Sequence, residues 1–324
     1  MREAPMKQAI EGRELITLDQ HGPFVQGTYH RSCDTRLATS DGQRLGVLFL
    51  NSLSLPRTAT GDSAVYWADC LAACGYPTFR IDLPGLGDSE GNLPKDLLEF
   101  INLGGFAFET AQKARELVER FDLSGVIVVG HCAGAVSALF AAAESDVCRG
   151  LVLLDVYFHL PQAVRPKHRQ RLSDWALHSS LGRSMSNIYD QLKKLSLSMR
   201  RNKPPGNANF PLLRCWKEVT STGRPVLILK APARKTTGTK PRKGDFDYLD
   251  YILKMVRDRN QVTVTLTEGT DHSFANRLGR IAVQQEMESW LNSHFPLTQA
   301  QPSRPRLGSK MPLASSVNRL VSSK

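Results

Sequence analysis

A segment near the middle of the chain, GVIVVGHCAGAVSALFAAA (residues 125–143), constrains the fold more strongly than any other stretch. Its first residues are apolar without polar alternation, as in a strand that is buried on both faces of a parallel sheet. The small apolar residues from Ala133 onward predict a buried helix. The turn between strand and helix must be tight, so Cys132 at its centre is expected to project outward. Gly130 and Gly134 would give the backbone room to fold back.

The pattern of an apolar strand followed by a helix recurs along most of the chain, which has 324 residues. Such alternation predicts an α/β fold with a mainly parallel central sheet and helices on both of its faces. Strands are expected at 44–51, 76–82, 125–130, 149–156, 224–231 and 261–268, after an opening hairpin within residues 14–31. Helices are expected at 62–75, 96–121, 133–145, 246–259 and 279–295, with Gly104 and Gly105 delaying the start of the second.

The alternation breaks between two of these strands, and the chain is predicted to carry an insertion there. Residues 157–215 are basic and contain the loop sequence RNKPPGNANF, so they are expected to form a lid or cap. Residues 1–156 and 216–296 are then the two parts of the α/β core. Residues 297–324 are rich in Ser, Pro and Arg and poor in apolar residues, which predicts a disordered basic tail.

The net charge of +11 is concentrated in three segments. Residues 162–203 hold ten Lys and Arg against two Asp, residues 224–243 hold seven and no acid, and residues 297–324 hold five and no acid. The rest of the chain is therefore net acidic. Localised positive charge favours anionic partners such as phosphate-bearing acyl carriers, acidic carrier proteins or a membrane surface, with a merely solvated surface as the alternative. Nucleic acid is not expected, because no recognised binding motif accompanies the charge.

Other features of the sequence bear on compartment and cofactors. No run of about 18 apolar residues and no secretory signal are present, so a cytoplasmic protein is expected. The six cysteines have neither zinc nor redox spacing and are expected to be free thiols. Neither a metal site nor a cofactor is predicted, since the sequence offers no ligand cluster and no phosphate-binding loop.

The tight turn predicts a nucleophile at Cys132. Unpaired N–H groups and the positive end of the helix dipole favour a thiolate there. The backbone N–H of Ala133 is placed to bind an oxyanion. A nucleophile of this kind needs a base, and His272 is the candidate. It follows an apolar strand, so it is expected at the same edge of the sheet as Cys132.

A third group is expected to orient the base. The first acids after the strand at 224–231 are Asp245 and Asp247. We expect Asp245 to be the triad acid, with Asp247 as the alternative. The competing interpretation is that both carboxylates simply begin a helix, where acids are favoured in any case.

The chain order of nucleophile, acid and histidine, with the nucleophile on a strand–turn–helix, resembles the α/β-hydrolase family over residues 13–295. The loop GLGDSEG (85–91) resembles the GxGDSxG loop of that family, and GTDHSF (269–274) resembles its histidine loop. The elbow around Cys132, including His131, is similar to that of hydrolases encoded with exosortase systems. The resemblance implies that the N–H of Leu53 is an oxyanion donor, although Asn51-Ser52 stands where the family usually has His-Gly.

A cysteine in place of serine changes which acyl donors are favourable. Forming an acyl-cysteine thioester is uphill from an ordinary ester and nearly level from a thioester. The sequence therefore predicts a Cys–His–Asp enzyme that hydrolyses or transfers acyl groups of thioesters or esters through an acyl-cysteine. Its substrate would be a small acyl compound, carried by coenzyme A or by a carrier protein.

Three alternatives stay open at this point. The first is a plain carboxylester hydrolase. The second is a non-catalytic binding or scaffold relative of the fold, in which Cys132 is inert. The third is a protein whose basic tail contacts a membrane surface.

Overall fold

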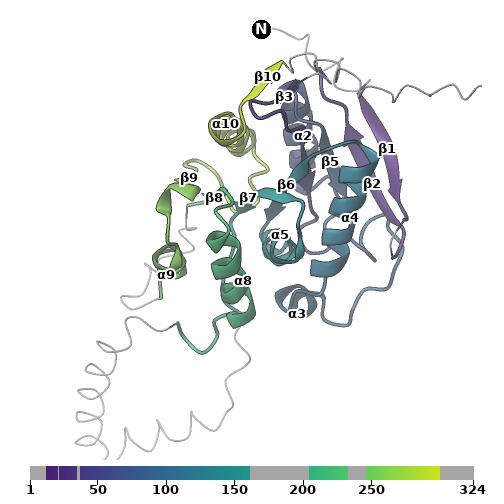
Figure 1. Ribbon diagram of the computed structural model, residues 1–324. Coiled ribbons are helices and arrows are strands. Elements are labelled where there is room, and N and C mark those ends of the chain that lie inside the picture. Colours follow the sequence, from purple (N-terminus) through teal and green to yellow (C-terminus); the bar gives the residue numbers. More distant parts are fainter. Residues whose placement is uncertain (1–11, 21, 35–36, 161–203, 233–245, 300–324) are drawn as a thin grey trace, which may run out of the picture.

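An eight-stranded sheet forms the centre of the protein (Figure 1). The computed structural model describes residues 12–20, 22–34, 37–160, 204–232 and 246–299. The strand order is β1-β2-β5-β4-β6-β7-β8-β9. The strands are β1 (Arg13–Leu18), β2 (Val25–His30), β4 (Leu45–Phe49), β5 (Thr78–Ile81), β6 (Gly125–His131), β7 (Cys148–Leu154), β8 (Val226–Lys230) and β9 (Val262–Leu266). β1 and β2 pair antiparallel with their neighbours and all later pairs are parallel, which confirms the predicted α/β fold.

Helices cover both faces of this sheet (Figure 1). One face carries α2 (Ser63–Ala73) and α10 (Arg277–His294), which pack against each other. The other face carries α3 (Leu97–Asn102), α4 (Ala107–Arg120), α5 (Ala133–Glu144), α8 (Phe210–Ser221) and α9 (Tyr248–Met255). Two short 3₁₀ helices, η1 (Thr60–Asp62) and η2 (Arg259–Gln261), precede α2 and β9.

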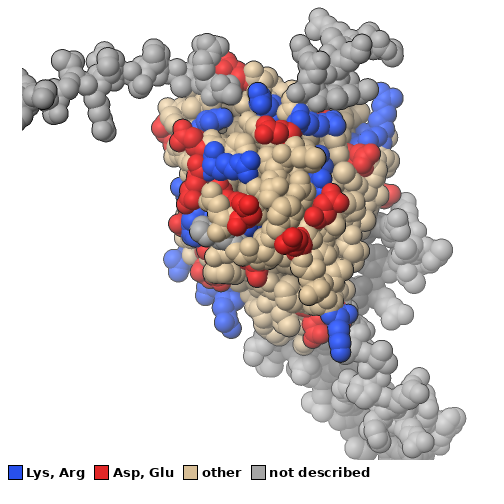
Figure 2. Space-filling view, turned by 90° about the vertical axis from the view of Figure 1, so that its right-hand side faces the viewer, with Lys and Arg blue, Asp and Glu red and all other residues tan. Residues whose placement is uncertain are grey.

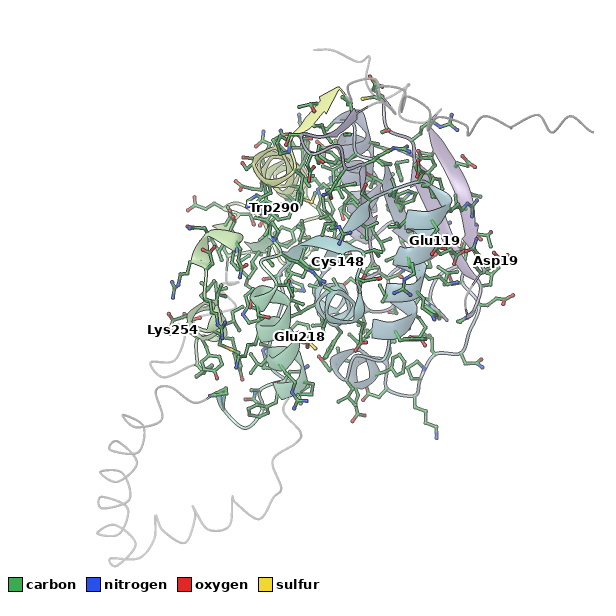
Figure 3. The ribbon with its side chains drawn as sticks, in the orientation of Figure 1. Asp19, Glu119, Cys148, Glu218, Lys254 and Trp290 are labelled. Atoms are coloured by element: carbon green, nitrogen blue, oxygen red, sulfur yellow. The ribbon has the colours of Figure 1, made fainter. Side chains whose placement is uncertain are left out.

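The core has two halves, one on each side of the sheet. Along β6, Val126 and Val128 pack on the α5 side, whereas Ile127 and Val129 pack on the side of α2 and α10. Successive side chains of a strand point to opposite faces, so a strand buried on both faces is apolar throughout, as predicted for 125–130. Figure 3 shows Trp290 of α10 and Glu218 of α8 on opposite sides of Cys148, which begins β7.

The expected long helix at 96–121 is divided into α3 and α4. Asp96 begins α3 by accepting a hydrogen bond from the N–H of Glu99 at 2.8 Å. Gly104 ends it with a φ of 82°, and a Cβ at this position would lie 3.0 Å from the ring of Phe140 on α5. The glycine therefore allows the chain to turn while α3 stays close to α5.

The end of the described chain differs from the prediction of a disordered tail from residue 297. Leu297–Gln299 forms β10, which pairs antiparallel with β3 (Leu37–Thr39). Leu297 is partly buried against the core beneath this pair, and that apolar contact accounts for the extra strand. Residues 300–324 lie outside the described part of the chain.

The insertion predicted at 157–215 leaves the core through a short paired stem. The N–H of Leu160 donates to the carbonyl of Asn207 at 2.7 Å, and the N–H of Asn209 donates to that of Phe158 at 2.9 Å. Residues 161–203 lie outside the described residues, so a lid there stays a prediction. The expected boundary at 215 falls inside α8, whose residues Leu212 and Trp216 are fully buried in the core.

The three basic segments lie largely outside the described ranges, which omit 161–203, 233–245 and 300–324. On the face shown in Figure 2, Lys and Arg side chains are interspersed with Asp and Glu. Within the described ranges, every helix is too short or too polar to cross a membrane.

Candidate active site

Cys132 occupies the turn between β6 and α5. Its backbone has a φ of 52° and a ψ of −113°, in a region that residues other than glycine rarely adopt. The two glycines are required by close backbone approach. A Cβ on Gly130 would lie 2.2 Å from the carbonyl oxygen of Gly134, and a Cβ on Gly134 would lie 2.3 Å from that of Asn51. The segment therefore forms the tight strand-to-helix turn that the sequence predicts.

His272 lies in the loop between β9 and α10 and meets Cys132. Its Nδ1 is hydrogen-bonded to Oδ2 of Asp155, which leaves Nε2 for the neighbouring thiol of Cys132. The interactions with the side chains of Asp155 and Cys132, that with Asp155 first, outweigh burial and raise the pKa of His272 to about 10. A protonated imidazole stabilises a neighbouring thiolate. His272 is therefore protonated at neutral pH.

The carboxylate that meets His272 is Asp155, and this corrects the expected position of the acid. Asp155 directly follows β7, and its N–H donates to the carbonyl of Leu229 on β8 at 2.7 Å. Asp245 lies outside the described residues. Asp247 caps α9, where its Oδ1 accepts a hydrogen bond from the N–H of Asp250 at 3.0 Å. Among the described acids, the one that is hydrogen-bonded to His272 thus follows β7, one strand earlier in the sheet than the acids that the sequence singled out.

Lys230, the last residue of β8, holds the other oxygen of this carboxylate. Its Nζ lies 2.5 Å from Oδ1 of Asp155 and donates to the carbonyl of Val156 at 3.2 Å. Burial alone would raise the pKa of Asp155, but the hydrogen bonds with His272 and Lys230 hold it below its usual value. Asp155 is therefore charged at neutral pH, and each of its oxygens has a fixed partner.

His131 supports the loop that carries His272. Its Nε2 lies 2.6 Å from the backbone carbonyl of His272 and must donate the proton in this bond. The two imidazole rings are 5.1 Å apart, and the ring of Phe274 meets His131 edge-on at 5.7 Å. Burial lowers the pKa of His131 to about 4, so this ring stays neutral. It acts on the position of His272 and is not a second base.

The loop after β4 carries the expected oxyanion donor Leu53. The amide of Asn51 is buried and fastens this loop: its Nδ2 donates to Oδ1 of Asp82 at 2.7 Å and to the carbonyl of Leu55 at 3.0 Å. The other expected donor, Ala133, is buried in the first turn of α5, where N–H groups have no partner within the helix. The contribution of both N–H groups to an oxyanion hole stays a proposal.

Backbone strain is concentrated in these loops. Seven described residues other than glycine have positive φ angles, and four of them are Leu53, Cys132, Asp155 and Phe274. Each such residue costs about 1–3 kcal/mol, and such residues cluster at functional sites because the surrounding structure must hold them. The four belong to four separate loops that follow β4, β6, β7 and β9.

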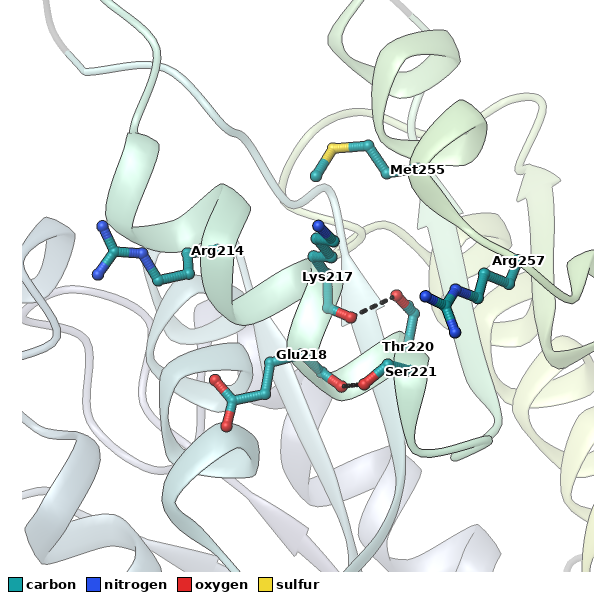
Figure 4. Close-up of a pocket in the computed structure, with 7 residues that line it drawn as sticks. All are labelled: Arg214, Lys217, Glu218, Thr220, Ser221, Met255 and Arg257. Atoms are coloured by element: carbon teal, nitrogen blue, oxygen red, sulfur yellow. Dashed lines mark hydrogen bonds between the residues drawn. The ribbon is translucent and has the colours of Figure 1, made fainter.

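A separate hollow lies away from these residues. It has a volume of about 480 Å³ and is formed by α8 and the residues around the end of α9 (Figure 4). Its lining residues are Arg214, Lys217, Glu218, Thr220, Ser221, Met255 and Arg257. None of the candidate catalytic residues lines it.

The family of the protein follows from its sequence as well as its fold. The model of the α/β hydrolase family matches residues 47–282, which is more than half of the chain. The protein belongs to the α/β hydrolase family. No curated protein matches the sequence.

Solved structures of the same fold are numerous but distant. The α/β hydrolase GrgF from Penicillium sp. sh18 is 14% identical, with a TM-score of 0.56 over 87% of this chain and 99% of that one. An esterase from Pyrococcus furiosus is 12% identical, with a TM-score of 0.55 over 91% and 95%. The esterase domain of a Rhodothermus marinus protein is 14% identical, with a TM-score of 0.51 over 87% and 98%. At these identities the likeness concerns the fold.

Sequence reasoning missed two members of the site. Asp155 ends the apolar run LVLLD, so an acid at the end of the strand next to that of Cys132 was a usable signal. Lys230 ends the neighbouring run VLILK in the same way.

Proposed function

We propose that the protein hydrolyses or transfers acyl groups of thioesters or esters, with Cys132 as nucleophile, His272 as acid and base, and Asp155 as the orienting acid. The observation that carries this proposal is the position of His272, whose ring is hydrogen-bonded to Asp155 and lies beside the thiol of Cys132. A strained turn that presents the thiol and a fixed carboxylate that orients the imidazole are what an activated nucleophile requires.

In the first half of the reaction the Cys132 thiolate attacks the carbonyl carbon of the acyl donor. The negative charge moves to the carbonyl oxygen, where the N–H groups of Leu53 and Ala133 would stabilise it. When this intermediate collapses, the bond to the leaving thiolate or alkoxide breaks, and the leaving group takes the proton from Nε2 of His272. The acyl group is then bound to the sulfur of Cys132.

In the second half a water molecule or another acceptor attacks the acyl-cysteine. His272 removes the proton of the acceptor, and the thiolate of Cys132 leaves as the product acid, ester or amide is released. The raised pKa of His272 suits the first half, because the imidazolium is present when the leaving group needs a proton. A thioester donor is favoured, since exchange of one thioester for another is nearly level in free energy.

The test is intact-mass analysis after incubation with acyl-coenzyme A thioesters, N-acetylcysteamine thioesters and p-nitrophenyl esters. We expect a mass increase of one acyl group, mapped to the peptide that contains Cys132. The adduct should be absent from Cys132→Ala and retained in Cys33→Ala, which removes an exposed thiol outside the site. Turnover of esters without turnover of thioesters would instead support the plain carboxylester hydrolase. Neither adduct nor turnover with any donor would support the non-catalytic relative.

A carrier-bound donor is the second part of the proposal. The described residues on either side of the basic segment 162–203 form a stem close to the site, at 158–160 and 207–209. Stem residue Phe158 follows Asp155 by three positions. Positive charge supplied there would attract the phosphates of coenzyme A or an acidic carrier protein.

A further inference from the structure

The hydroxyl of the partly buried Tyr157 and the buried amide of Asn102 lie near Cys132 and have no role in the mechanism above. Tyr157 follows Asp155 by two residues, and its Oη is buried. Asn102 ends α3 and is 1% exposed. Among the described residues, neither the Tyr157 hydroxyl nor either side-chain atom of Asn102 has a hydrogen-bond partner of normal geometry. Buried polar groups are nearly always paired, so such an orphaned cluster calls for an explanation.

The two side chains are neighbours of each other and of the nucleophile. The Asn102 amide is close enough to lower the pKa of Tyr157, and a charge on Cys132 is close enough to raise it. Burial is the largest cause, and together these effects raise the pKa of Tyr157 to about 12. The hydroxyl therefore keeps its proton at neutral pH and can donate a hydrogen bond. Helix α3, which ends at Asn102, packs against α5, the helix that follows Cys132.

Asn209 holds the backbone on both sides of the pair. Its side-chain Nδ2 donates to the carbonyl of Asn102 at 2.8 Å, and its N–H donates to the carbonyl of Phe158 at 2.9 Å. Asn209 itself is 1% exposed. The main chain at both residues is thus fixed, while their polar side-chain atoms are left for another partner.

We infer that Tyr157 and Asn102 form a specificity subsite that binds an uncharged oxygen, a hydroxyl or a carbonyl, on the acyl chain of the substrate. The pair offers one hydroxyl, two amide protons and one amide oxygen, which can serve either kind of oxygen. Neither residue carries a charge, and a carboxylate would lie near the Cys132 thiolate and be repelled. The subsite therefore selects oxygenated acyl chains over plain and over carboxylated ones. This inference rests on the proposed function, because it concerns the acyl group delivered to Cys132.

The experiment compares kcat/KM for 3-hydroxybutyryl, 3-oxobutyryl and butyryl thioesters of N-acetylcysteamine. We expect the unaltered protein to favour at least one oxygenated donor over butyryl by at least about tenfold. Tyr157→Phe removes only the hydroxyl and should reduce this ratio to about one, and Asn102→Leu should reduce it as well. Tyr66→Phe is the matched control. Its hydroxyl bonds Gln284 on the other face of the sheet, and its loss should leave the ratio unchanged.

Thermal unfolding separates recognition from a structural role. Removing an unpaired buried hydroxyl should leave the Tm of Tyr157→Phe unchanged or raise it, whereas removing a hydroxyl paired within the fold, or to a fixed water, should lower it. A Tm that falls, or a ratio that is the same in Tyr157→Phe and the unaltered protein, would overturn the inference. A ratio of one in the unaltered protein, with butyryl turned over normally, would overturn the subsite and leave the proposed function intact. No turnover with any donor would refute the proposed function and the subsite together.

Discussion

Replacing Asp155 with Asn tests the proposed catalytic triad at the member that the structure adds to it. The substitution keeps the shape of the side chain but removes its charge and turns one acceptor oxygen into an NH₂ donor. Both carboxylate oxygens are engaged, Oδ2 with His272 and Oδ1 with Lys230. Because the ammonium of Lys230 can only donate, an amide at position 155 can serve one neighbour with its oxygen and must present NH₂ to the other.

The Lys230 ammonium carries a full charge, so it should keep its hydrogen bond to the amide oxygen at position 155. NH₂ then faces Nδ1 of His272, Nδ1 becomes the acceptor, and the ring proton moves to Nε2. In that tautomer His272 cannot accept the proton of Cys132. A hydrogen bond to a charged group contributes about 1.5–3 kcal/mol, or roughly 10- to 150-fold in rate. Half of the His272 side chain is exposed, so solvent screens part of the charge effect. The lost hydrogen bond and the unfavourable tautomer of His272 act together, so we expect kcat/KM to fall by about 100-fold or more.

The assay is the rate of Cys132 alkylation by iodoacetamide at pH 7, mapped by peptide mass, because it requires no knowledge of the substrate. Alkylation of Cys132 should slow in Asp155→Asn. It should recover in part when Lys230→Met is added, since the amide oxygen is then free to face His272. Asp247→Asn is the matched control, because Asn caps a helix as well as Asp does. An Asp155→Asn rate within threefold of the unaltered protein, or a loss of rate in Asp245→Asn instead, would refute the reasoning.

Three further predictions concern the elbow, the catalytic histidine and the basic segment. Gly134→Ala should lower the unfolding free energy by about 3 kcal/mol in urea titrations, because its Cβ would meet a backbone oxygen at 2.3 Å. Gly206→Ala, where nothing lies within 4 Å, is its control. The pKa of His272 is raised from 6.5 to about 10. Its protonated form therefore contributes stability fully below pH 6.5, and this contribution is lost as the pH rises through 10. The stability difference between the unaltered protein and His272→Gln should shrink over that range, and a growing difference would contradict the assignment. Neutralising Arg165, Lys167, Arg169 and Arg171 together should raise KM for coenzyme A thioesters and spare small neutral esters, and equal effects on both would count against a carrier-bound donor.

The sequence predicts the fold well because the sheet strands are buried on both faces. The strands at 125–130 and 150–154 are continuous apolar runs, and the first is followed by a turn and a helix with its own pattern. The elbow was also predictable, since Gly130 and Gly134 are required by backbone contacts that allow no side chain. The opening hairpin was predicted on similar local grounds, whereas Gly104 was expected to delay a single helix and instead separates α3 from α4.

The acid was not predictable from local pattern alone. Asp155 and Asp247 each come after a strand of the sheet, and chain position does not say which carboxylate reaches His272. Only the pairing of β7 between β6 and β8 brings Asp155 beside both His272 and Lys230. The pair of Tyr157 and Asn102 is harder still, because it depends on how α3 packs against α5.

The stem at residues 158–160 and 207–209 lets the chain leave the core and return at one point. Hydrogen bonds such as that between Leu160 and Asn207 fix the two ends before residue 161 and after residue 203. The cost of closing a loop grows only slowly with its length, so these two fixed ends could be joined by a loop of another length at small cost in closure entropy. Cys132, Asp155 and Lys230 lie at the ends of β6, β7 and β8, and His272 lies in the loop after β9, all outside this segment. A chimera with a short loop in place of 161–203 would therefore show which part of the activity and of the substrate preference belongs to the core alone.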